Sequence, residues 1–160
     1  MVEQVVHLEV GEPKIRLFEK KRPIAAVAEL VWNGLDANAT QVDVTIERSL
    51  TDAIDRIIVS DNGDGITPEQ AQDSFREYGD TWKSTHAHTL RKGRILHGRN
   101  GEGRLYALAL GDTFTWDSVA MADGELLRTR ISTTRSHPTI WTITGPETAT
   151  AGLPTLRMNS

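Results

Sequence analysis

The feature that most constrains the fold is a change of hydrophobic periodicity between residues 22 and 60. Apolar residues first recur at spacings of three and four, which predicts an amphipathic helix over about residues 22–38. Pro23 suits the first helical turn, and Asn38 suits a left-handed helix end. In residues 42–46 the pattern changes to strict alternation, the period of a half-buried strand.

Further elements can be read along the chain. Residues 56–60 are β-branched and apolar, as in a central strand, and residues 50–53 before them indicate a hairpin turn. Thr67, with Gln70 three positions later, predicts the start of a helix that continues to about Tyr78.

The second half of the sequence is rich in strands. A helix is predicted over residues 104–110, and strands are predicted over 113–121, 125–133, 139–144 and 156–158. Successive strands with a few helices indicate an α+β fold. We expect a two-layer α/β sandwich, with helices on one face of a mixed, mostly antiparallel sheet.

Composition narrows the class of protein. The 160 residues suit one domain, and no stretch has the roughly 20 apolar residues that would span a bilayer. Cysteine is absent, which excludes disulfide scaffolds and thiolate metal sites. The net charge of −4 does not indicate direct nucleic-acid binding, and the N-terminus has no signal-peptide pattern. We therefore expect a cytoplasmic domain.

Three polar side chains share one face of the predicted helix. Glu29, Asn33 and Asp36 are spaced i, i+4, i+7. A solvated helix face is one interpretation. Against it, the segment carries little Lys or Arg, and Gly34 in mid-helix costs roughly 1 kcal/mol of helix propensity. Such a break of a local rule is expected at a functional site.

A turn cluster, Asp61-Asn62-Gly63-Asp64-Gly65, follows the second predicted strand. An ordinary Asx turn would explain it. A carboxylate fixed at the end of a strand would also suit an exocyclic amine such as that of adenine, with the glycines allowing a ring to approach the backbone. A calcium loop is excluded, because Gln72 stands where its final Glu is required.

A glycine-rich run precedes the predicted helix at 104–110. It consists of Gly98, Arg99, Asn100, Gly101, Glu102 and Gly103. Glycine-rich turns that enter helices can hold phosphates with backbone N–H groups. The run is neither a Walker A loop nor a dinucleotide fingerprint, so by itself it is a weak signal.

The polar stretch before this run contains Lys83-Ser84, which could reach a phosphate or be solvated. It also contains His86, His88 and His97, which are too isolated for a metal prediction.

In order and spacing, the three clusters resemble the motifs of the GHKL superfamily. These read Glu-x-x-x-Asn-x-x-Asp-Ala, Asp-x-Gly-x-Gly and Gly-x-x-Gly-x-Gly in this sequence. The superfamily includes DNA gyrase, heat-shock-protein-90 chaperones, histidine kinases and MutL mismatch-repair proteins. The resemblance covers about residues 22–111 and, more loosely, the strands beyond.

The resemblance implies a role for each matching residue. Glu29 matches the general base of the hydrolytic members, and Asn33 matches the residue that coordinates Mg²⁺ at the phosphates. Asp36 lies at a nucleotide-pocket position. Asp61 matches the carboxylate that reads adenine, and Gly65 matches the glycine beside the base. The resemblance further assigns to nucleotide binding Gly63, Lys83, Ser84, Gly98, Arg99, Asn100, Gly101, Glu102, Gly103 and Thr155.

It also implies the Bergerat fold, with ATP and Mg²⁺ as cofactors and an ATP lid over about residues 79–103. Residues 1–160 would then form one ATP-binding domain, the N-terminal module of a longer protein. The missing C-terminal part would contain transducer and dimerisation domains, and ATP would promote a homodimer. The isolated domain would hydrolyse ATP slowly.

The implied function is a conformational switch driven by ATP binding and hydrolysis, either chaperone-like or MutL-like. The alternative is a non-hydrolysing nucleotide sensor or interaction module on the same fold. Glu29 separates the chain from histidine kinases, which lack a hydrolytic base of this kind.

Overall fold

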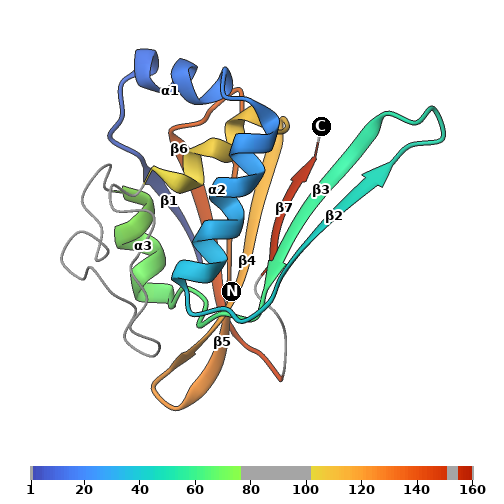
Figure 1. Ribbon diagram of the computed structural model, residues 1–160. Helices are drawn as coiled ribbons and strands as arrows, with labels where there is room; N and C mark the ends of the chain where they lie inside the picture. The colour runs from blue at the N-terminus through green and yellow to red at the C-terminus, as the bar shows by residue number, and fades with distance from the viewer. Residues whose placement is uncertain (1, 77–101, 151–154, 160) are drawn as a thin grey trace.

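The computed structural model describes residues 2–76, 102–150 and 155–159. Their strands form one seven-stranded sheet in the order β1-β6-β5-β4-β7-β3-β2, and every pair of neighbours is antiparallel (Figure 1). The strands are β1 Glu3–His7, β2 Val42–Arg48, β3 Ile54–Asp61, β4 Thr113–Ala122, β5 Glu125–Thr134, β6 Ile140–Thr148 and β7 Thr155–Asn159.

The helices lie on one face of this sheet (Figure 1). They are α1 Glu12–Glu19, α2 Pro23–Asp36, α3 Pro68–Arg76 and the 3₁₀ helix η1 Gly103–Ala109. The predicted α+β sandwich is confirmed. Among the described residues, no helix is long and apolar enough to cross a membrane.

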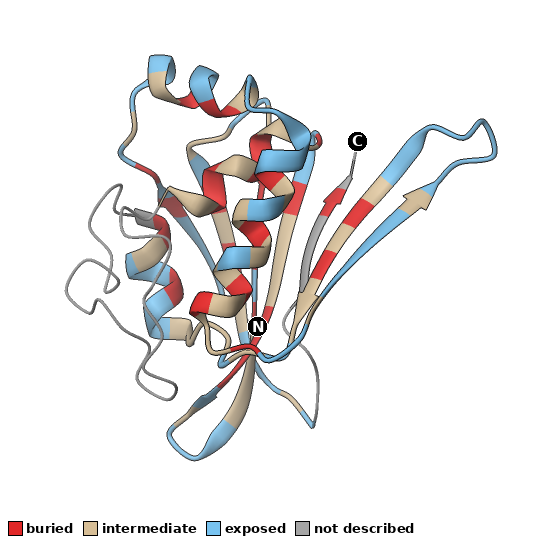
Figure 2. Cartoon of the chain, viewed as in Figure 1, coloured by how far each residue is buried: buried red, intermediate tan, exposed pale blue. Residues whose placement is uncertain are grey.

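The core fills the space between the two layers, where the buried residues of α2, η1 and the sheet meet (Figure 2). An aromatic cluster joins α3 to the sheet: the ring of Phe75 lies 4.9 Å from Trp141 and 5.7 Å from Trp116, centroid to centroid. Tilted and edge-on ring pairs of this kind contribute roughly 0.5–1.5 kcal/mol beyond the burial of their area.

Helix α2 forms as the periodicity predicts. Pro23 occupies its first turn, and Asn38, with a φ of 66°, ends it in the left-handed region. Its inner stripe buries Ala26, Leu30 and Gly34. The capping box before α3 is also confirmed, because Thr67 N–H donates to Gln70 Oε1 at 3.0 Å and Gln70 N–H donates to Thr67 Oγ1 at 3.2 Å.

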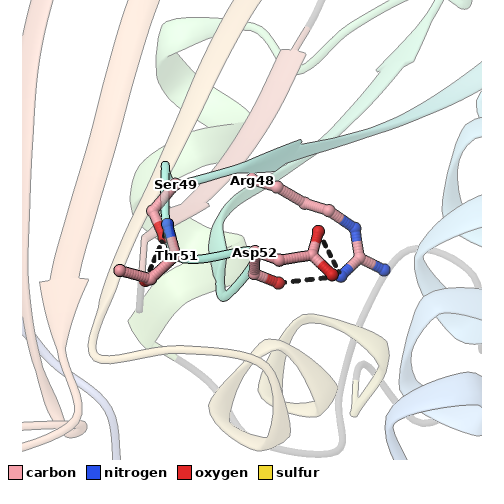
Figure 3. A network of polar contacts seen from close by, with 4 residues as sticks. All are labelled: Arg48, Ser49, Thr51 and Asp52. Carbon is pink, nitrogen blue, oxygen red and sulfur yellow. Dashed lines mark hydrogen bonds and ion pairs between the residues drawn. The ribbon is translucent and has the colours of Figure 1, made fainter.

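The β2–β3 hairpin is closed by its own side chains (Figure 3). Arg48 Nη1 donates to the carbonyl oxygen of Asp52 at 2.9 Å, and the hydroxyls of Ser49 and Thr51 lie 2.9 Å apart. Asp52 adopts a φ of 64°, which an Asp tolerates better than most residues. The hairpin turn predicted for residues 50–53 is therefore confirmed.

Sequence patterns missed two elements and one helix type. Strand β1 buries only Val6 of its five residues, and α1 is eight residues long, so neither carries a strong periodic signal. The helix predicted over residues 104–110 is present as the 3₁₀ helix η1. These elements depend on tertiary contacts, because β6 is the one partner of β1 among the described strands and α1 packs through Ile15 and Phe18.

Candidate functional site

Two of the predicted clusters meet between α2 and η1. Asn33 on α2 lies against Gly103, the first residue of η1: a Cβ on Gly103 would stand 2.6 Å from Asn33 Oδ1. Glu29, one turn earlier, is half-buried, and Asp36 is 3 % exposed. The helix face of Glu29, Asn33 and Asp36 is therefore not a solvated stripe, and Gly103 permits the close approach.

Asp61 lies at the end of β3, directly beside Gly34 of α2. A Cβ on Gly34 would stand 3.0 Å from both Asp61 Cβ and Val42 Cγ2. The mid-helix glycine thus has a tertiary reason, because a larger residue would push α2 away from the strand that carries Asp61.

The carboxylate of Asp61 is fixed and half-buried. Its Oδ1 accepts the Gly63 N–H at 2.8 Å, which is the Asx turn that the sequence indicated. Burial raises the pKa of Asp61 above its ordinary value of 3.8, and the Gly63 hydrogen bond partly opposes this. A carboxylate held in an environment that disfavours its charge is a common feature of binding sites.

The loop after β3 is tied to the end of α2. Asp64 N–H donates to the carbonyl oxygen of Ala37 at 2.7 Å, and Asn38 Nδ2 donates to Asp64 Oδ2 at 2.6 Å. Asn62 Oδ1 accepts the Gln41 N–H at 3.0 Å. These bonds fix the loop to the end of α2 and to the segment that leads into β2.

The same loop is anchored to β4 from the other side. Ser118 Oγ accepts the Ile66 N–H at 2.7 Å and donates to the Ile66 carbonyl oxygen at 3.3 Å. Gly65 has a φ of +70°, and a Cβ there would overlap the carbonyl oxygen of Val119. Ser118 was not predicted, because a Ser within a strand carries no sequence signal for this contact.

Helix α1 adds charged groups at the beginning of η1. Lys14 Nζ lies 3.2 Å from Glu102 Oε1. Tyr106 of η1 packs edge-on against Phe18 at 5.2 Å, and burial raises its pKa, assisted by the charges of Glu29 and Glu102. Lys14 opposes that rise. Sequence reasoning missed Lys14 because no motif covers α1.

Several predicted residues fall outside the described part of the chain. These are Lys83, Ser84, Gly98, Arg99, Asn100 and Gly101, with most of the predicted lid. His86, His88 and His97 lie there too. Thr155 begins β7, where its backbone pairs with Ser60 and Asp117.

A cavity of about 190 Å³ lies away from these groups, between the start of α3 and the sheet. Its lining includes Val2, Pro68, Gln72, Thr129 and Pro146. None of the predicted site residues that the structure describes lines it.

The chain was compared with known protein families. A family model described as "Histidine kinase-, DNA gyrase B-, and HSP90-like ATPase" matches residues 22–154. The chain belongs to this ATPase family. The match includes α2, the loop after β3 and η1, and it begins after α1.

Within this family the chain is similar to MutL mismatch-repair proteins. It is 43 % identical over 82 residues to a "DNA mismatch repair protein MutL" of Exiguobacterium sibiricum, which covers 51 % of this chain and 13 % of the relative. With the protein of the same name from Limosilactobacillus reuteri it shares 32 % identity over 111 residues, 69 % of this chain and 16 % of the relative. The chain thus spans a small part of the length of these relatives.

We expect Gly65→Ala to destabilise this GHKL-type domain more than Gly124→Ala does. Both glycines have positive φ, at +70° and +82°, which costs an alanine roughly 1–2 kcal/mol. Only Gly65 faces an overlap, with Val119, which adds roughly 1–3 kcal/mol, whereas nothing lies within 4 Å of a Cβ on Gly124. Urea unfolding of both variants measures the difference. Equal losses would show that the contact between the loop and β4 is looser than described.

We expect Asp61→Asn to be more stable than the wild type at neutral pH. Because the folded chain raises the pKa of Asp61, stability falls as the pH rises from the ordinary pKa of 3.8 through the raised pKa of the folded state. The amide keeps an oxygen for the Gly63 N–H. The gain should shrink as the pH falls toward 3.8, the ordinary pKa of the group.

Urea unfolding over a pH series measures this gain. Asp55→Asn, at an exposed position of the same strand, controls for the loss of one negative charge. An equal gain in both variants would assign the effect to net charge rather than to the burial of Asp61.

Proposed function

We propose that this chain binds ATP with Mg²⁺ and hydrolyses it, as the switch module of a larger MutL-like protein. The observation that carries the proposal is the meeting of three groups: the half-buried Asp61, the α2 face of Glu29 and Asn33, and Gly103 against that face. Asp61 supplies a hydrogen-bond acceptor for a base, Asn33 a ligand for Mg²⁺ at the phosphates, and Glu29 a carboxylate for an attacking water molecule. Membership of the ATPase family supports it.

Asp61 is assigned to adenine. The Gly63 N–H binds Oδ1 and so orients the carboxylate, and we assign Oδ2 to the exocyclic amine of the base. Gly63 and Gly65 let the loop pack directly on the carbonyl oxygens of Ala37 and Val119, where a Cβ would overlap, so the loop has a fixed path beside Asp61. Burial around Asp61 strengthens a hydrogen bond made there, because the local dielectric is low.

Asn33 is assigned to Mg²⁺ at the phosphates. The described residues bring together no group of three or more His, Asp or Glu side chains that could hold a metal. A carboxamide oxygen does suit Mg²⁺, which takes few protein ligands and completes its shell with phosphate oxygens and water. Its place against Gly103 fits that role. When bound, the ion would neutralise charge on the phosphates.

Glu29 is assigned as the general base. It would accept the proton of a water molecule that attacks the γ-phosphate, while the β–γ bond breaks and ADP leaves. A side chain on the rigid helix α2 is better positioned for this task than one on a loop.

The chain would act together with further domains. The curated MutL relatives are several times longer than the matched segment, which supports C-terminal transducer and dimerisation domains beyond it. We propose that ATP promotes a homodimer of the whole protein and that this module alone turns over slowly. A conformational change of the module on binding ATP is the switch to which an attached domain would respond.

Calorimetric titration with a non-hydrolysable ATP analogue tests binding. We expect the wild type to bind, more tightly with Mg²⁺ than without it. Asp61→Asn should lose detectable binding, because its oxygen stays on the Gly63 N–H and its NH₂ group, a donor, then faces the adenine amine. Asp55→Asn is the matched control, with the same chemical change on the same strand. Unchanged binding by Asp61→Asn would contradict the adenine assignment.

Turnover tests Glu29 separately. We expect Glu29→Ala to lower the rate of phosphate release by roughly 10²–10⁴-fold, the contribution of a general base, with binding of the analogue nearly unchanged. Glu19→Ala, on α1 and outside the site, should keep the wild-type rate. Equal turnover with and without Glu29 would favour a non-hydrolysing nucleotide sensor.

A further inference from the structure

Helix α1 lies outside the segment that matches the ATPase family model, yet it packs on η1 at the proposed site. Its buried residues Ile15 and Phe18 fix the helix, and Phe18 contacts Tyr106 of η1. Lys14, next to Ile15, is thereby held where its ammonium meets Glu102 at 3.2 Å.

Glu102 is the N-cap residue of η1 and belongs to the glycine-rich run that the resemblance assigns to nucleotide binding. It directly precedes Gly103, the residue that touches Asn33. With Asn33 assigned to Mg²⁺ at the phosphates, the proposed site places the charge of Glu102 near them. A negative side chain there repels an ATP molecule, whose triphosphate carries several negative charges. The repulsion falls if a cation neutralises the carboxylate.

We propose that Lys14 is a positioning residue for nucleotide binding: its ammonium neutralises Glu102 and holds the entry of η1 against α2, so that this segment accepts a polyphosphate. The inference rests on the proposed ATP site. It assigns to α1 a task in nucleotide selection, because the benefit grows with the number of phosphates on the ligand.

Two further observations agree with this role. The charges of Glu29 and Glu102 raise the pKa of Tyr106, and the charge of Lys14 lowers it. The Lys14 ammonium therefore offsets the electrostatic effect of both carboxylates at Tyr106. The Lys14–Glu102 pair is also partly exposed, at 44 % and 29 %, and such pairs contribute roughly 0–1 kcal/mol to folding. The Lys14–Glu102 pair therefore contributes little to the stability of the fold.

The test is the affinity of the full chain for adenosine, ADP and a non-hydrolysable ATP analogue, measured by calorimetry for the wild type and Lys14→Ala. We expect Lys14→Ala to weaken the ATP analogue about five-fold, the effect of one charge pair at roughly 4 Å in water. The affinity for ADP should fall less, and the affinity for adenosine should not change. Lys14→Arg should restore the affinity because it keeps the charge.

Arg16→Ala is the matched control. It removes a cation from the same helix, where Arg16 pairs with Glu12 at 2.6 Å and is exposed. Its affinities should equal those of the wild type. An equal loss for Arg16→Ala and Lys14→Ala would attribute the effect to net charge and overturn the proposal.

The double variant Lys14→Ala, Glu102→Gln separates neutralisation from direct contact. If Lys14 acts through Glu102, the Lys14→Ala substitution weakens binding of the ATP analogue much less in the Glu102→Gln background than in the wild type. An equal loss in both backgrounds, or a loss that is equal for adenosine, overturns the proposal. A wild type that binds none of the three ligands would instead overturn the proposed function, and this inference with it.

Discussion

The close packing of α2 on the end of β3 sets the position of the other groups at the site. Gly34 is the residue that allows it, since a side chain there would meet Asp61 and Val42 at 3.0 Å. Glycine in a helix interior costs roughly 1 kcal/mol, and the packing buries a carboxylate whose pKa rises in consequence. The mid-helix glycine and the buried carboxylate both lower stability where Asp61 meets the polar face of α2.

The loop between β3 and α3 is held from two directions. On one side, Asp64 binds the end of α2, and on the other, Ser118 binds both polar groups of the Ile66 backbone. Because β4 is a central strand, this second anchor is as rigid as the sheet itself. The glycines of the loop allow this close packing on Ala37 and Val119, and the backbone next to Asp61 therefore has a defined position.

Membership of the ATPase family and the similarity to MutL agree with this arrangement, since the matched segment contains α2, the loop and η1. Helix α1 lies before that segment and still contributes Lys14 and Phe18 to the surroundings of η1. The surroundings of the proposed site thus extend beyond the part of the chain that defines the family. The Lys14–Glu102 contact joins α1 to the segment that matches the family model.

The sequence by itself determined the elements whose signals are local. Helix α2, the β2–β3 hairpin and the capping box of α3 follow from periodicity, turn residues and a three-residue spacing, all of which act within a few positions of the chain. The proposed site residues Glu29, Asn33 and Asp61 could be selected in the same way, because their spacing is a property of one helix and one turn. Only the tertiary structure decided the existence of α1 and β1, the 3₁₀ form of η1, the contact of Asn33 with Gly103 and the partners of Ser118 and Lys14. Each of these depends on contacts between residues far apart in sequence, and those contacts form only when the sheet and the helix layer have already met.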